Sequence, residues 1–231
     1  DSYKAFSITI TAGDQYFDNV SLLLSANTPS STFISDASTN NLATVINGTA
    51  KPNNLNPYSS GYYSIYFDGS SYLTAPTSTT SQLNFATGCS IEGWSYLTSY
   101  AGYGFMFDTY QGSGNFVGWW FVGHMPGGNW RISAGNASAV DTGVAMALNT
   151  WNHWVMTNDG TRTRFFVNGV LQYTALITPQ NVDQYFVFST YGGGYYGSYP
   201  ITGYLSNMRF IKGSSNIPAS YQTSSTTTGT T

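Results

Sequence analysis

Charged side chains are scarce in this chain of 231 residues. Asp, Glu, Lys and Arg together make up 7% of it, whereas soluble domains usually carry about 25%. With seven Lys and Arg and a net charge of −3, the chain cannot line a track of phosphates, which argues against nucleic-acid binding. Hydroxyl and amide groups must keep the surface soluble instead, a composition typical of extracellular and virion proteins.

Cysteine and long apolar runs are also lacking. Cys89 is the single cysteine, so an internal disulfide is impossible and packing must supply the stability. Its strand-like surroundings favour a buried, inert thiol. The chain has no apolar run of about 18 residues, so no membrane span is expected. No signal-peptide pattern opens it, which fits a processed form or a piece of something longer.

Helical periodicity is nearly absent, and short strand-like runs bounded by Gly, Asn, Ser and Pro recur along the chain. The longest helix candidate, ASAVDTGVAMALN, favours a strand and a loop because it contains Gly143 and β-branched residues. Twelve strand-like runs predict an all-β fold, a two-sheet antiparallel β-sandwich of the jelly-roll kind. They are 5–10, 20–24, 62–67, 71–76, 89–97, 104–110, 115–123, 129–135, 151–159, 163–173, 185–190 and 203–213.

The stretch RFFVNGVLQYTAL (164–176) is the most specific of these signals. Asn168-Gly169 tolerates the positive φ angles of a two-residue type I′ turn, so the flanking runs predict a hairpin. The expected register pairs Val167 with Val170, Phe166 with Leu171, Phe165 with Gln172 and Arg164 with Tyr173. Both faces then carry bulky apolar groups, although a half-exposed strand needs only one such face.

The second face of that hairpin, with Phe166, Leu171 and Tyr173, must therefore be covered, because monomers rarely leave a wide apolar surface open. A glycan, the chain's own loops, or a neighbouring subunit or N-terminal arm could provide the cover. Permanent cover by loops or a partner is favoured, since these side chains are more hydrophobic than a wet sugar groove needs. We expect all three to be largely buried in the working assembly.

Three segments are expected along the chain. Residues 1–13 form a strand-like N-terminal arm, and residues 14–213 form the sandwich domain. Residues 214–231 are rich in Ser and Thr and bury too little apolar surface to order alone, so they predict a linker or a strap held by a neighbour.

Five of the strand-like stretches, taken in order, resemble the laminin-G-like branch of the concanavalin A-like lectin/glucanase superfamily. They are VSLLL, YYSIYFDGSSYLTAP, CSIEGWSYL, WNHWVMTNDGTRTRFFVNGVLQY and GYLSNMRFIKG. Together with its entry strand, the chain is most similar to modules in structural proteins of tailed phages, particularly marine ones. The resemblance implies a curved sheet whose concave side holds glycans. Asp68-Gly69 and Asp159-Gly160 are expected to form hairpins in the middle of that sheet.

Catalysis is not expected. The superfamily includes retaining glucanases, which need two carboxylates about 5 Å apart, and Glu92 is the only glutamate here. No acid stands at position 90 or 94, so the alternating acid motif is missing, and Glu92 is predicted to be satisfied by an arginine or a backbone amide. His124 and His153 are the only imidazoles; His153 is interpreted as a structural histidine.

Calcium, which laminin-G-like domains often hold at a loop rim, needs six to eight oxygen ligands. Ser206-Asn207 stands where many relatives have an acid, and no D-x-D-x-D-G run occurs. Scattered acids could still meet in space, but turn capping is the favoured interpretation, so no metal or other cofactor is expected and Ca²⁺ remains open. These acids are Asp18, Asp36, Asp68, Asp108 and Asp141.

Aromatic residues are the abundant class, at 17% with 19 Tyr. Two Gly-rich stretches, 99–115 and 190–200, are dense in Tyr, whose flat face and hydroxyl suit both sugars and protein partners. Trp119 and Trp120 must point to opposite faces of a regular strand, with one in the core and Trp120 taken as the ligand candidate. The candidate ligand-binding residues are Tyr100, Tyr103, Tyr110, Trp120, Tyr191, Tyr195, Tyr196 and Tyr199.

Three functions compete at this level. The first is a structural and adhesive module of a phage virion, such as a capsid decoration, fibre or tail appendage, with other virion subunits or a homo-oligomer as partners and a possible host-surface glycan. The alternative is a carbohydrate-binding module of a secreted or cell-surface bacterial protein. A divergent glycosidase is the third, and the missing acid pair disfavours it. The first two imply a virion or extracellular location. Fold alone does not decide among them.

Overall fold

A computed structural model describes residues 17–26, 34–58, 62–76, 88–109, 119–135, 139–179, 185–192 and 197–213. Both the expected arm (1–13) and the expected tail (214–231) lie outside these residues, as does the strand-like run 5–10. The one helical element in the described part is the single 3₁₀ turn Phe17–Asn19. None of the described helices is long and apolar enough to cross a membrane.

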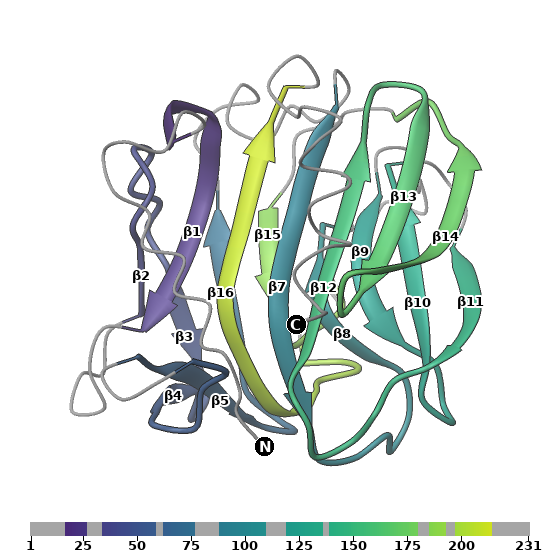
Figure 1. Ribbon diagram of the computed structural model, residues 1–231. Coiled ribbons are helices and arrows are strands. Elements are labelled where there is room, and N and C mark those ends of the chain that lie inside the picture. The colour runs from purple at the N-terminus through teal and green to yellow at the C-terminus, as the bar shows by residue number, and fades with distance from the viewer. Residues whose placement is uncertain are drawn as a thin grey trace.

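Two antiparallel sheets face each other, which confirms the predicted sandwich (Figure 1). Sheet A has the order β14-β13-β12-β7-β16-β1-β2, with β5 also pairing with β16 and β4 with β5. Sheet B has the order β11-β10-β9-β8-β15-β6-β3.

The strands of sheet A are β1 (Val20–Ala26), β2 (Ile34–Asp36), β4 (Lys51–Asn53), β5 (Ser64–Asp68), β7 (Cys89–Leu97), β12 (Asn152–Asn158), β13 (Arg162–Val167), β14 (Val170–Leu176) and β16 (Thr202–Lys212). Those of sheet B are β3 (Val45–Asn47), β6 (Tyr72–Pro76), β8 (Gly104–Asp108), β9 (Trp120–His124), β10 (Asn129–Ala134), β11 (Val140–Ala145) and β15 (Tyr185–Phe188). Sequence analysis missed the three-residue strands β2, β3 and β4, which are too short to show an alternating pattern.

The core lies between the sheets and is built from alternate residues of each strand. Trp154 and Phe165 from sheet A are completely buried, as are Trp120 and Trp130 from sheet B. The rings of Trp130 and Phe165 meet across the interface with centroids 5.5 Å apart. Cys89 is also fully buried in this core, and burial raises the pKa of its thiol well above the usual range, as expected for an inert cysteine.

The Asn168-Gly169 turn is confirmed, with φ of 50° and 79° at the two positions, as a type I′ turn requires. The predicted register holds for Val167–Val170 and Phe166–Leu171 and then fails. A bulge shifts it by one residue, so Phe165 pairs with Tyr173. The extra residue, Gln172, turns Tyr173 toward the sandwich core, because a bulge reverses which face the following side chains take.

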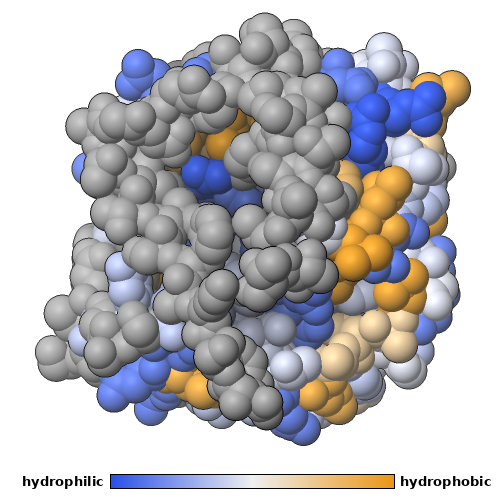
Figure 2. All heavy atoms as spheres, in the orientation of Figure 1, coloured by the Kyte–Doolittle hydropathy of each residue, from blue (hydrophilic) through white to orange (hydrophobic). Residues whose placement is uncertain are grey.

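The hairpin therefore carries apolar groups on its outer face in a different pattern from the one expected. Phe166 is 3% exposed, which matches the prediction, whereas Leu171 is 46% exposed. Its burial would require a partner and stays a prediction. Figure 2 shows the apolar surface over β13 and β14 near this edge.

Asp159-Gly160 connects β12 and β13 as a hairpin within sheet A, as predicted. The Asp68-Gly69 turn does not lie within one sheet. It joins β5 of sheet A to β6 of sheet B, so that prediction was wrong. Alternating runs on either side of a turn predict two strands. They do not show whether the two strands pair with each other in one sheet or lie in different sheets.

Candidate functional site

Three of the predicted tyrosines meet on the outer face of sheet B, in what we call the tyrosine cluster (Tyr103, Tyr191 and Tyr199). The Tyr199 ring lies 5.7 Å from Tyr103 and 5.9 Å from Tyr191, centroid to centroid, and both contacts are edge-on. The three rings come from different segments of the chain, before β8 and after β15. The sequence analysis singled out both segments for their tyrosines, and the structure brings these three rings together.

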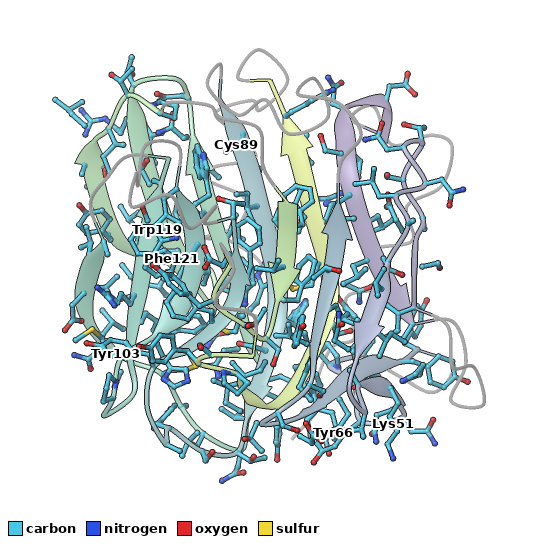
Figure 3. The ribbon with its side chains drawn as sticks, turned by 180° about the vertical axis from the view of Figure 1, so that it is seen from behind. Lys51, Tyr66, Cys89, Tyr103, Trp119 and Phe121 are labelled. Carbon is cyan, nitrogen blue, oxygen red and sulfur yellow. The ribbon has the colours of Figure 1, made fainter. Side chains whose placement is uncertain are left out.

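Beneath the tyrosine cluster lies a small second core of Phe105, Trp119 and Phe121. The Trp119 and Phe121 rings are 4.5 Å apart, and Figure 3 shows them side by side with Tyr103 close by. Above them the Arg131 guanidinium lies 5.1 Å from the centre of the Tyr103 ring and 5.9 Å from that of Phe121, within cation–π range.

A buried carboxylate ties this second core together. Asp108, completely buried, accepts hydrogen bonds from Trp119 Nε1 at 2.7 Å and from the backbone N–H of Gly192 at 2.9 Å. Tyr191 precedes Gly192, so this bond fixes the tyrosine cluster to the sheet. Among the described residues of this face, Tyr199, at 47%, is the one large exposed ring. The described tyrosines therefore serve mainly to pack against the second core.

Tyr100 lies apart from the tyrosine cluster. Its hydroxyl donates to the Met146 carbonyl, its ring is 5.2 Å from that of His124, and a Cβ on Gly128 would lie 2.5 Å from it. Burial raises the pKa of this phenol. Tyr100 therefore contacts both the β9–β10 turn and the segment after β11, and it is not part of the tyrosine cluster.

Trp120 is not a ligand-binding residue, because its side chain is completely buried in the core between the sheets. Trp119 and Trp120 do point to opposite faces, as expected, but Trp119 is also only 7% exposed. The prediction failed because both faces of this strand are covered. Trp120 packs between the sheets, and Trp119 packs in the second core on the outer face of sheet B. Tyr110, Tyr195 and Tyr196 lie outside the described residues.

A second aromatic surface crosses the outer face of sheet A, and sequence analysis did not find it. We call it the aromatic row: Tyr66 on β5, Tyr204 on β16, Tyr96 on β7 and Trp151 just before β12. All four side chains are partly exposed. The centroid distances between successive rings are 5.1, 5.8 and 5.6 Å.

Strand pairing places these rings on one face of the sheet. Tyr66 is paired with Tyr204, and Tyr204 with Tyr96, and directly paired residues of antiparallel strands point to the same face. The pairing of β7 with β12 ends at Ser95–Asn152, which brings Trp151 to the level of Tyr96. The Trp151 ring also lies 6.5 Å from that of Tyr204, so Tyr204, Tyr96 and Trp151 form a triangle of rings, and Tyr66 contacts Tyr204 on the β5 side.

A glycine allows the strands of the aromatic row to approach closely. Gly203, which precedes Tyr204, has φ +149°, and a Cβ there would lie 2.1 Å from the Tyr96 carbonyl oxygen. A larger residue would push β16 away from β7 and separate their rings, so the position requires glycine.

A second group of aromatic rings lies beside the aromatic row, and its Trp94 stands two residues before Tyr96 on β7. The group consists of Tyr58, Tyr62, Trp94 and His153. Trp94 and His153 are a directly paired couple with ring centroids 4.8 Å apart. Tyr58 lies 5.9 Å from Trp94 and 5.5 Å from Tyr62. Burial raises the pKa of Tyr58 to about 12, so this hydroxyl stays protonated at any physiological pH.

A buried ion pair lies on this face, between Glu92 and Arg209. Glu92 and Arg209, 6% and 7% exposed, are direct partners on β7 and β16, and both Arg209 Nε and Nη2 lie 2.5 Å from Glu92 Oε1. His153 Nε2 lies 3.7 Å from Glu92 Oε2. This confirms that an arginine satisfies Glu92, while the structural role of His153 stays a prediction.

Two of the acids considered for calcium, Asp36 and Asp68, cap separate turns. Asp36 accepts the backbone N–H groups of Leu23, Ser38 and Leu42, and Asp68 accepts those of Ser70 and Ser71. Hydrogen bonds, with that from Thr49 the largest contributor, hold the pKa of Asp68 well below its ordinary value. The described residues contain no group of three or more His, Cys, Asp or Glu suited to a metal ion.

Comparison with known families identifies the fold. A family model described as the concanavalin A-like lectin/glucanases superfamily matches residues 67–216, more than half of the chain. The chain belongs to this superfamily. No curated protein matches its sequence.

Solved structures share the fold at low sequence identity. Domain 4 of an extracellular family 43 arabinanase from Geobacillus stearothermophilus, in complex with arabinotriose, has a TM-score of 0.62 at 15% identity, covering 90% of this chain and 98% of that domain. The binding domain of Paraclostridial mosquitocidal protein 1 has a TM-score of 0.62 at 14% identity, over 86% and 50% of the two chains.

The binding domain of botulinum neurotoxin DC, in complex with SialylT, has a TM-score of 0.59 at 14% identity over 85% of this chain and 48% of that one. Our chain thus spans about half the length of the two toxin chains. At these identities the similarities establish the fold alone.

Proposed function

We propose that this chain is a non-catalytic carbohydrate-binding module that holds a glycan on the aromatic row. The observation that carries the proposal is the group of four partly exposed aromatic rings in mutual contact, three on the neighbouring strands β5, β16 and β7 and one, Trp151, just before β12. Tyr and Trp combine a flat apolar face with a polar edge, and sugars present C–H faces ringed by hydroxyl groups. Rings fixed on strands are also held more firmly than rings on loops.

Hydrogen-bonding groups accompany the rings. The hydroxyls of Tyr66, Tyr96 and Tyr204 can both donate and accept. Trp151 Nε1 is buried without a hydrogen-bond partner, a condition that usually carries a cost, and a bound hydroxyl could satisfy it after a small ring movement. The arabinanase domain in complex with arabinotriose and the toxin domain in complex with SialylT support the proposal by analogy of fold.

The state of Glu92 supports a function without hydrolysis. Retaining glucanases use one carboxylate as nucleophile and a second as acid/base. Here the chain's only glutamate has Oε1 held by Arg209, so this carboxylate oxygen is already engaged in an ion pair. We therefore expect binding of oligosaccharides without turnover.

The test is isothermal titration of a glycan-array hit against the wild type and Trp151→Ala. Removing this indole should weaken binding at least tenfold, about 1.4 kcal/mol. Tyr199→Ala, which removes an exposed ring from the tyrosine cluster, is the matched control and should bind like the wild type. Equal affinity of Trp151→Ala and wild type, or release of reducing sugar by the wild type, would contradict the proposal.

A second candidate is the structural or adhesive module of a virion, in which the same glycan site would serve host attachment. One observation favours a partner subunit: Val170, Leu171 and Leu176 on the edge strand β14 are 59%, 46% and 74% exposed, more apolar area than an isolated edge usually shows. A closed ring or other symmetric oligomer in solution, measured by mass and electron microscopy, would support this candidate.

A further inference from the structure

The outer face of sheet A also has a buried part beyond the aromatic row, which we call the covered patch. Its residues lie side by side on β1, β16, β7, β12 and β13 through direct strand pairing. Each of them is at most 3% exposed. They are Val20, Ile211, Ser90, Thr157, Val155 and Phe166.

The side chains of the covered patch point away from the core between the sheets. Successive residues of a strand point to opposite faces. Val155 lies between Trp154 and Met156, and Ile211 follows Phe210, and these three neighbours belong to that core. The four apolar residues of the patch belong to neither core cluster, so they must be covered from the outside.

The cover has a definite extent. Every described strand belongs to one of the two sheets, so no described strand lies over the patch as a third layer. Leu171, the partner of Phe166 on β14, is 46% exposed, so the cover ends between β13 and β14. Five strands about 4.8 Å apart span about 19 Å, which roughly six extended residues can cross at about 3.3 Å each.

Both ends of the described chain leave the sandwich beside the covered patch. β1 starts at Val20 and β16 ends at Lys212, one residue after Ile211, and Val20 and Ile211 are direct partners. Figure 1 shows the start of β1 and the end of β16 at the same end of sheet A. The expected arm (1–13) and the expected tail (214–231) are therefore both long enough and close enough to reach the patch.

The chemistry of the patch distinguishes the arm from the tail. The hydroxyls of Ser90 and Thr157, which are direct partners, are buried without a hydrogen-bond partner. A segment rich in Ser and Thr, as the tail is, would offer them donors and acceptors, whereas an apolar surface would not. The unsatisfied hydroxyls therefore favour an apolar cover.

We propose that the arm of the same chain lies across the covered patch as an extended segment. Its run AFSITI (5–10) has six residues, the length that the span requires, and alternates apolar side chains with Ser and Thr. In the extended state Phe6, Ile8 and Ile10 face the sheet, and Ser7 and Thr9 face solvent. This docking is independent of the glycan site and would stand if that proposal failed.

Thiol accessibility tests the proposal, because the chain's one native cysteine, Cys89, is fully buried and gives no background. Ile8→Cys and Thr9→Cys place single thiols on opposite sides of the extended arm. In the folded full-length protein, maleimide should label Ile8→Cys at least about tenfold more slowly than Thr9→Cys, and in urea the two rates should be equal. Equal rates in the two folded variants, at unchanged circular dichroism, would overturn the proposal.

Two further measurements separate the other possible covers. Ile217→Cys reports on the tail and should react as fast as Thr9→Cys. Slow labelling at 217 together with fast labelling at 8 would assign the cover to the tail and overturn the proposal. Protection of Ile8→Cys should not change with protein concentration. Protection that is lost on dilution would mean that the arm of a neighbouring copy covers the patch, and it would overturn the assignment to the same chain.

A charge on the arm gives an independent readout. Ile8→Asp should lift the arm from the patch and raise, several-fold, the fluorescence of a dye that binds exposed apolar surface. Thr9→Asp is the matched control, because its side chain faces solvent, and it should leave the fluorescence at the wild-type value. The same fluorescence in both variants would contradict the proposed orientation of the arm.

Discussion

The outer faces of the two sheets use aromatic residues in opposite ways. On sheet B, Tyr103, Tyr191 and Tyr199 pack edge-on against each other over a small second core. On sheet A, the rings of the aromatic row project from the strands themselves and remain partly exposed. A high local density of Tyr and Gly therefore marked segments whose described tyrosines Tyr103 and Tyr191 pack against a second core, whereas the partly exposed rings of sheet A come from separate segments of the chain.

The two faces also differ in the partners of their buried acids. Asp108 on sheet B accepts hydrogen bonds from neutral donors, Trp119 and Gly192. Glu92 on sheet A faces the arginine of a neighbouring strand at 2.5 Å. A buried carboxylate with a cation depends strongly on that cation, whereas one held by neutral groups loses a smaller contribution when a single donor is removed. Removing the cation that faces Glu92 should therefore destabilise the fold more than removing one neutral donor to Asp108.

Arg209→Met should give the largest effect. It leaves the carboxylate of Glu92 buried without its cation, which should lower the free energy of unfolding by about 3–5 kcal/mol. Urea unfolding at pH 7 measures the loss.

The control for this prediction is the double variant Glu92→Gln with Arg209→Met, which removes both charges and should recover much of the lost stability. A single variant as stable as wild type at pH 7 would mean that solvent reaches Glu92 and that this part of the face is open.

Trp119→Phe should give an intermediate effect and compare the two faces directly. The change keeps an aromatic ring but removes the Nε1–H that donates to Asp108, which should cost about 1–3 kcal/mol. Trp151→Phe is the matched control, because Trp151 Nε1 has no hydrogen-bond partner, and its unfolding free energy should stay close to that of wild type. Calorimetric melting of both variants gives the comparison. Equal losses would show that the two indoles have equivalent surroundings.

Local patterns predicted the sandwich well because alternation and turn chemistry act over a few residues. The Asn168-Gly169 turn, the strand at Cys89–Leu97 and the burial of Cys89 all follow from neighbours in the sequence. The shift at Gln172 could not be predicted from the same pattern, since a bulge depends on how the completed sheet twists.

The candidate site was harder to predict because it depends on register between distant strands. Tyr66, Tyr96 and Tyr204 each lie on the outward side of an alternating run, which is unremarkable for any one strand. Only the pairing of β5, β16 and β7 brings them together. Outward aromatic residues on several strands were a usable signal, but it required the strand order, which the sequence does not state.

The smallest expected effect concerns the edge of sheet A, where Phe166 and Leu171 are direct partners with opposite burial. Leu171 is 46% exposed in the single chain, so Leu171→Asp should change the free energy of unfolding of the monomer by no more than about 0.5 kcal/mol. Phe166→Asp, the control, places a charge at a buried position and should prevent folding. If a second chain covers β14, Leu171→Asp should convert a wild-type oligomer into folded monomers, which sedimentation velocity and circular dichroism would show together. A wild type that is monomeric at all concentrations, or a Leu171→Asp protein that loses its β-sheet spectrum, would contradict the view of β14 as an edge that a partner covers.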